Sequence, residues 1–192
     1  MWNPSRSLLL LCSSAIACSD PTAATPSAST ARGVVALEPV ASAGGIELAV
    51  NGGGHVLRDL GNGEELTTFS YSVIRRADGT TNGEFQYDFR AANLIVHGHV
   101  TCVTAAGNIA WVGGVIDRLQ SEDPVDQELV GTDIWWRVTD NGEGAADAPD
   151  QTTSLLFTIA GVPITAQSWC NDQPTRGVQR PITQGNIQVR AN

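Results

Sequence analysis

Two histidines, His97 and His99, have a type and spacing that suggest metal chemistry. Alternate side chains of a β-strand lie on one face, so a strand here would place both imidazoles side by side. Such a pair suits zinc, and His55 could add a third ligand. The simpler interpretation is a solvated polar face, because Val96 and Val100 lie on the opposite face of the same strand.

An acidic turn is the second candidate metal site. Asp140, Glu143 and Asp147 lie close together after a predicted strand. Calcium takes about six to eight oxygen ligands, and a loop of this composition could supply several of them. The spacing differs from that of an EF-hand loop, and the pair Asn141-Gly142 also favours an ordinary turn. A calcium site and a plain turn are therefore both possible.

Trp135 and Arg137 are the candidate ligand-binding residues. Trp135 and Trp136 are adjacent, so in a strand they face opposite sides and only one can be in the core. An outward Trp135 would share a face with Arg137 and could bind a small molecule, a carbohydrate or a protein. Because most tryptophans are at least partly buried, a packing role is the alternative.

The first 17 residues have the anatomy of an export signal. Arg6 precedes an apolar run that is too short for the roughly 20 residues of a membrane-spanning helix. Residues 15–17 followed by Cys18 are similar to a bacterial lipobox. They predict lipidation of Cys18 and attachment to the outer membrane or cell surface through lipid only. Ala15 stands where leucine is commonest, so a secreted form is the alternative.

The rest of the chain divides into a tether and one domain. Residues 18–32 contain the anchor cysteine and a stretch of small, hydroxylated and proline residues that cannot form a core. Residues 33–192 are enough for one domain with an ordinary hydrophobic core. We expect this domain to be monomeric.

Cysteine usage follows from the export signal. Cys12 leaves with the signal and Cys18 is the lipid anchor, which leaves Cys102 and Cys170. An even pair in an oxidising compartment is expected to form a disulfide. Cys102 shares a predicted strand face with Val96, so it should point into the core. If Cys18 is not lipidated, it is an odd thiol and the pairing is ambiguous.

The sequence pattern predicts that β-strands position the candidate site residues. Phe69, Tyr71 and Val73 alternate with polar residues, and a second alternating run, residues 84–90, follows a Gly-containing turn; together they predict a hairpin. No helical period is sustained, and 20 Gly and 9 Pro punctuate the chain. We predict an all-β fold, a single antiparallel β-sandwich or barrel of about 8–10 strands. Further strands are expected at residues 34–40, 46–50, 55–60, 94–104, 109–116, 133–139, 154–159 and 186–190.

Charge and missing motifs restrict the function. The formal net charge is −9, with 20 acidic residues and no lysine, which argues against nucleic acid as a partner. The sequence has no Gly-x-Ser-x-Gly elbow, His-Glu-x-x-His motif or phosphate-binding loop, and it predicts no cofactor. An enzyme is therefore less expected than a binding or structural protein. A carbohydrate-active hydrolase with paired carboxylates is the alternative.

Three short runs resemble a known pattern. Residues 97–102, 107–114 and 138–144 read HGHVTC, GNIAWVGG and VTDNGEG. In order and spacing they are similar to a group of uncharacterised exported bacterial β-domain proteins, and more loosely to the post-COAP type of secreted module. The resemblance covers roughly residues 52–160 and implies a β domain on an exported chain, but no activity. The expected function is non-catalytic ligand binding or a structural role in the cell envelope.

Overall fold

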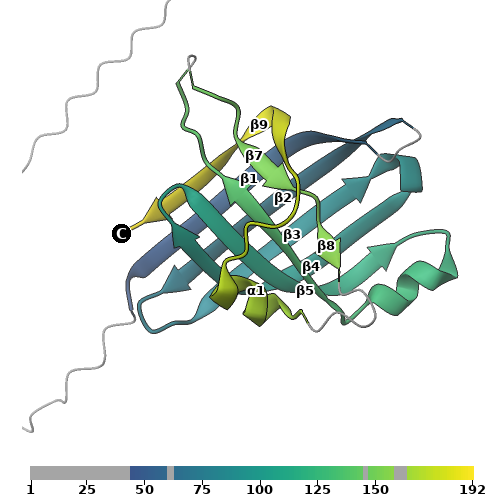
Figure 1. Cartoon of the computed structure of the whole chain (residues 1–192). Coiled ribbons are helices and arrows are strands. Elements are labelled where there is room, and N and C mark those ends of the chain that lie inside the picture. Colours follow the sequence, from purple (N-terminus) through teal and green to yellow (C-terminus); the bar gives the residue numbers. More distant parts are fainter. Residues whose placement is uncertain (1–43, 60–62, 145–146, 158–163) are drawn as a thin grey trace, which may run out of the picture. The chain divides into compact units, whose positions relative to one another are not determined.

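Antiparallel pairing of long alternating segments builds the sheet (Figure 1). A computed structural model describes residues 44–59, 63–144, 147–157 and 164–192, which all belong to one unit spanning residues 39–192. The elements are β1 (Ile46–Asp59), β2 (Glu64–Arg76), β3 (Thr81–Phe89), η1 (Arg90–Ala92), β4 (Leu94–Ala106), β5 (Ile109–Gln120), η2 (Pro124–Leu129), β6 (Asp133–Thr139), β7 (Gln151–Thr153), β8 (Leu156–Phe157), α1 (Ala166–Asp172) and β9 (Gln179–Ala191).

The sheet closes into an eight-stranded barrel. Its strand order is β5-β4-β3-β2-β1-β9-β7-β6, and a further pairing of β5 with β6 joins the two ends. The short strand β8 is added to β6 beside the barrel. The all-β prediction is confirmed, and of the two predicted architectures the structure is the barrel.

Aromatic side chains fill the barrel interior. The alternating residues of β2 and β3 point inward, as their period of two predicted, and Trp136 reaches them from β6 on the opposite wall. The Trp136 ring centroid lies 5.4 Å from that of Phe85, 5.6 Å from Tyr71 and 5.8 Å from Tyr87. The interior is thus a packed core, and the candidate sites lie on the outer surface.

Strands β1 and β9 are much longer than the sequence predicted. Residues 46–50 and 55–60 were expected as separate strands, but β1 runs through the glycine sequence between them. A Cβ at Gly54 would collide with the backbone of Gln184, so glycine here lets β1 and β9 approach closely. Likewise β9 begins at Gln179 and not at residue 186, because its first residues pair with β7.

Several predicted segments fall wholly or partly outside the described residues. The export signal, Cys18, the tether and the expected strand at 34–40 are among them. Within the expected strand at 154–159, residues 154–157 are described, and β8 is the strand among them. Among the helices of the described ranges, no segment is long and apolar enough to cross a membrane.

Candidate functional site

A helix that the sequence did not predict, α1, covers the outer face of β4, β5 and β6 (Figure 1). Thr165 and Ser168 form a reciprocal capping box that starts it. Trp169 anchors it: the ring is fully buried against Trp111 and Trp135, and its indole N–H donates to the Trp136 carbonyl at 3.0 Å. With only seven residues, α1 is too short to show a helical period in the sequence.

The predicted disulfide between Cys102 and Cys170 ties α1 to β4. Cys102 does not point into the barrel core, as its strand face suggested. Val100 pairs with Gly114 and Cys102 with Gly113, so Thr101 is an extra residue that forms a β-bulge. The bulge turns Cys102 to the outer face, where it packs with Cys170 and Ala166.

Gly113 and Gly114 of β5 lie opposite this bulge, and both are positions of close approach. A Cβ at Gly113 would lie 2.8 Å from the Ala166 Cβ and from the Cys102 sulfur. A Cβ at Gly114 would lie 2.9 Å from the Phe85 ring inside the barrel. Strand β5 is therefore covered on both sides, which agrees with its continuous apolar sequence.

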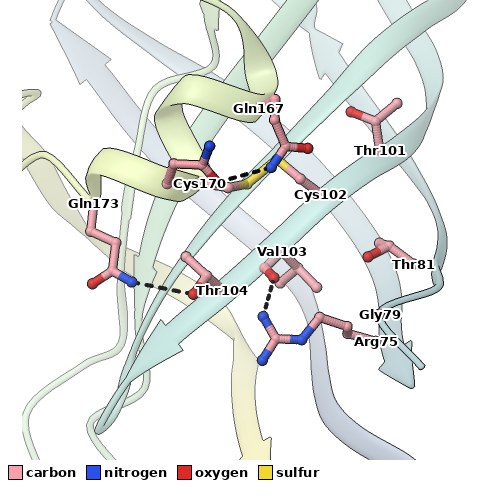
Figure 2. A pocket seen from close by; sticks show the side chains of 11 residues that line it. Arg75, Gly79, Thr81, Thr101, Cys102, Val103, Thr104, Gln167, Cys170 and Gln173 are labelled. Atoms are coloured by element: carbon pink, nitrogen blue, oxygen red, sulfur yellow. Dashed lines mark hydrogen bonds between the residues drawn. A yellow bond between two sulfur atoms is a disulfide. The ribbon is translucent and has the colours of Figure 1, made fainter. Parts of the chain in front are cut away.

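A polar pocket of about 360 Å³ lies between α1, β4 and the turn that joins β2 to β3 (Figure 2). Gln167 and Asn171 extend from one face of α1, and the Gln167 amide donates to the Asn171 carbonyl oxygen at 3.0 Å. The Gln173 amide donates to the Thr104 hydroxyl at 3.2 Å. The lining consists of Arg75, Gly79, Thr81, Thr101, Cys102, Val103, Thr104, Gln167, Cys170, Asn171 and Gln173.

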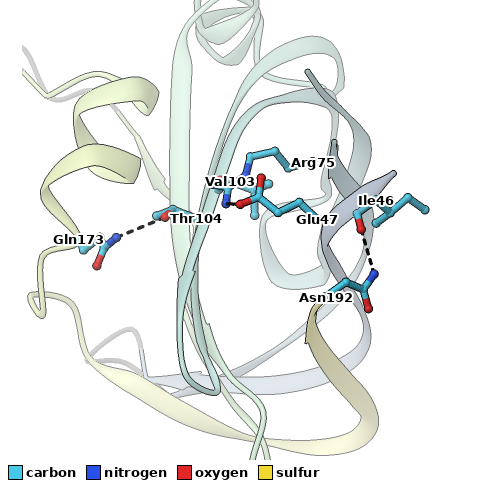
Figure 3. A network of polar contacts seen from close by, with 7 residues as sticks. All are labelled: Ile46, Glu47, Arg75, Val103, Thr104, Gln173 and Asn192. Atoms are coloured by element: carbon cyan, nitrogen blue, oxygen red, sulfur yellow. Dashed lines mark hydrogen bonds and ion pairs between the residues drawn. The ribbon is translucent and has the colours of Figure 1, made fainter. Parts of the chain in front are cut away.

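Arg75 is the charged side chain of this lining, and its charge is offset. The guanidinium donates to the Val103 carbonyl at 2.9 Å and to the Glu47 carboxylate at 3.2 Å (Figure 3). Both side chains are partly exposed, so the pair adds little stability but balances the charge at the pocket wall. The pocket therefore presents mainly neutral hydroxyl and amide groups.

Trp135 and Arg137 face outward from the barrel but do not form the open binding surface that we expected. Helix α1 and the segment after it cover them, and their exposed fractions are 3% and 7%. The Arg137 guanidinium donates to the carbonyls of Pro174 (3.1 Å) and Gly177 (3.4 Å). This pair holds the covering segment on the barrel, and all four described tryptophans are buried.

The histidines do not come together as a metal site. His97 and His99 lie on the outer face of β4, as predicted, whereas His55 lies on β1 and contacts the Thr68 hydroxyl at 3.0 Å. His99 Nδ1 is 2.8 Å from a carboxylate oxygen of Asp117. Among the described residues, no three His, Cys, Asp or Glu side chains are grouped as metal ligands would be.

Two adjoining hollows, of about 310 and 230 Å³, flank His97 on this outer face. Both are lined by Glu84 and His97; Gln86 lines the first hollow, and Asp117 and Arg118 line the second. Burial, and then the positive charge of Arg118, lowers the pKa of His97 below its usual value. The imidazole is therefore neutral at pH 7.

The acidic turn, for which a calcium site and a plain turn were the two interpretations, hydrogen-bonds to the chain's own donors. Asp140 accepts the N–H groups of Gly142 (3.0 Å) and Val189 (2.9 Å), and Asp147 accepts that of Gly144 at 2.7 Å. Glu143 accepts hydrogen bonds from the side chains of Asn186 and Gln188 on β9. These carboxylates bind the chain's own donors, and within the described segments they form no metal cluster.

Asp150 also joins this turn to β9, and the sequence analysis did not predict this role. Its buried carboxylate accepts the N–H groups of Asn141 (2.8 Å) and Ile187 (2.7 Å). The lining residues of the polar pocket were missed as well. The spacing of Gln167 and Asn171, four residues apart after the capping pair Thr165 and Ser168, is the signal that could have found them.

Comparison of this chain with protein-family models, with curated proteins and with solved structures finds no match in any of the three. The resemblance to exported β-domain proteins stays a prediction.

Proposed function

We propose that the domain is a non-catalytic binding module that takes a small, neutral, hydroxyl-rich molecule, such as a sugar unit, in the polar pocket beside α1. The composition of the lining carries this proposal: three threonine hydroxyls and three side-chain amides surround one guanidinium. Hydroxyls and amides both donate and accept hydrogen bonds, which suits the hydroxyl groups of a sugar.

The electrostatics and rigidity of the pocket support the same ligand class. The Glu47 carboxylate offsets the charge of Arg75, so a neutral ligand meets no uncompensated charge. The disulfide and the buried Trp169 fix α1, so the amides of Gln167 and Asn171 are held in place before a ligand arrives. We further propose that Cys18 anchors the exported protein by lipid, as residues 8–18 suggest.

Calorimetric titration of the protein with neutral mono- and disaccharides tests the proposal. Each sugar is matched by an analogue of the same size that carries a carboxylate or an amine. We expect a neutral sugar to bind best and Asn171→Ala to weaken it about 2- to 10-fold through loss of hydrogen bonds. Asn171 is exposed, so this variant should fold normally.

Gln86→Ala is the matched control, because Gln86 lines a hollow on another face and should leave binding unchanged. Binding that is insensitive to Asn171→Ala, or preference for a charged analogue, would reject the proposal. The hydrolase alternative has less support, since the polar pocket has no carboxylate among its described lining residues. Hydrolysis of a panel sugar that is lost in Glu84→Gln would favour it.

A further inference from the structure

Two of the three polar side chains that pack together inside the barrel, Tyr71, Tyr87 and Trp136, carry a polar atom with no hydrogen-bond partner among the described residues. These atoms are the Tyr71 hydroxyl and the Trp136 indole N–H, whereas the Tyr87 hydroxyl contacts the Thr152 side chain. These side chains are almost fully buried, with exposed fractions of 4%, 1% and 0%. Buried polar groups in folded proteins are nearly always paired with protein or with ordered water. Two such groups on rings that pack against each other therefore need an explanation.

The three residues share one region of the interior. They come from β2, β3 and β6, and both tyrosine rings pack against Trp136. The Tyr71 hydroxyl lies over Gly52 on β1, where a Cβ would overlap it. Burial, and then the proximity of Tyr87 and Asp150, raises the pKa of Tyr71, which places these groups near one another. Donors and acceptors from several strands thus gather at the barrel centre.

We propose that ordered water inside the barrel hydrogen-bonds the Tyr71 hydroxyl and the Trp136 indole N–H. A phenol hydroxyl both donates and accepts, and an indole N–H only donates, so bridging water can complete both groups. The Asp150 carboxylate accepts two backbone N–H groups and still has acceptor capacity for the same water. Buried water of this kind is a structural component of many cores.

The sign of a stability change tests this proposal. If water completes the Tyr71 hydroxyl, Tyr71→Phe leaves that water without a partner and should lower the Tm by about 2–4 °C. If the hydroxyl has no partner, the same substitution removes a desolvation penalty and raises the Tm. An unchanged or raised Tm would overturn the proposal. Phenylalanine keeps the ring, so the core should stay packed.

A second measurement detects the water directly. Nuclear magnetic resonance of the protein should show magnetisation transfer from long-lived water to the Trp136 indole proton. Trp169 is the matched control, because its indole N–H is equally buried but donates to the Trp136 carbonyl. We expect the transfer at Trp136 and not at Trp169. Absence of transfer at Trp136 would overturn the proposal.

Discussion

Single carboxylates complete the barrel where a strand is too short to do so. Strand β7 has only three residues, so it pairs with the first part of β9 and leaves Ile187 and Val189 beyond its reach. Asp150 and Asp140 accept the N–H groups of these two residues. A charged acceptor makes a stronger hydrogen bond than a carbonyl does, so two side chains replace the missing part of the ladder.

This role predicts the effect of one substitution. In Asp150→Asn, one of the two acceptor oxygens becomes an NH₂ group that faces a backbone N–H, so a buried donor loses its acceptor. We expect the free energy of unfolding to fall by about 1–3 kcal/mol, measured by denaturant titration. Asp147→Asn is the control, because Asp147 is exposed and should change the value by less than about 0.5 kcal/mol. Equal effects of the two variants would contradict the structural role of Asp150.

At the scale of elements, α1 is an addition to a barrel that has its own core. The aromatic interior and the layer beneath α1 are separate clusters of buried residues. The disulfide joins β4 to α1 across a sequence separation of 68 residues. Because its main effect is to restrict the unfolded chain, the disulfide should stabilise the domain without determining the barrel.

The double variant Cys102→Ala/Cys170→Ala tests this separation. The loop-closure model predicts a loss of about 4 kcal/mol in the free energy of unfolding, with the β-sheet circular dichroism spectrum retained. The wild-type protein measured in a reductant is the reference and should lose a similar amount. Loss of the β spectrum under native conditions would show that the barrel depends on the disulfide.

Regular strands could be predicted from the sequence, and irregular positions could not. The hairpin of β2 and β3 was evident because Phe69, Tyr71 and Val73 repeat with the period of a strand. The bulge at Thr101 has no such signal, yet it decides which way Cys102 points. The burial of Trp135 depends on α1, which is separated from it in sequence and is too short to show a helical period.

At the scale of the whole molecule, the closed barrel withdraws both tyrosines of the chain from bulk water. Burial is the main cause that raises the pKa of Tyr71 and of Tyr87 above the ordinary value. The unfolded chain ionises these phenols near pH 10, whereas the folded barrel keeps them neutral. Below pH 10 the two tyrosines leave stability unchanged, and above it only the unfolded state loses protons.

The free energy of unfolding should therefore fall as the pH rises above 10, by up to about 2.7 kcal/mol per pH unit for two groups. Near-ultraviolet absorbance of tyrosinate reports Tyr71 and Tyr87 alone, because the chain has no other tyrosine. We expect the tyrosinate band to appear abruptly, together with loss of the β circular dichroism spectrum. The protein unfolded in guanidinium, as the control, should titrate smoothly near pH 10. A smooth titration of the folded protein at that pH would mean that bulk water reaches the phenols without unfolding, and that the closed barrel does not exclude bulk solvent from its centre.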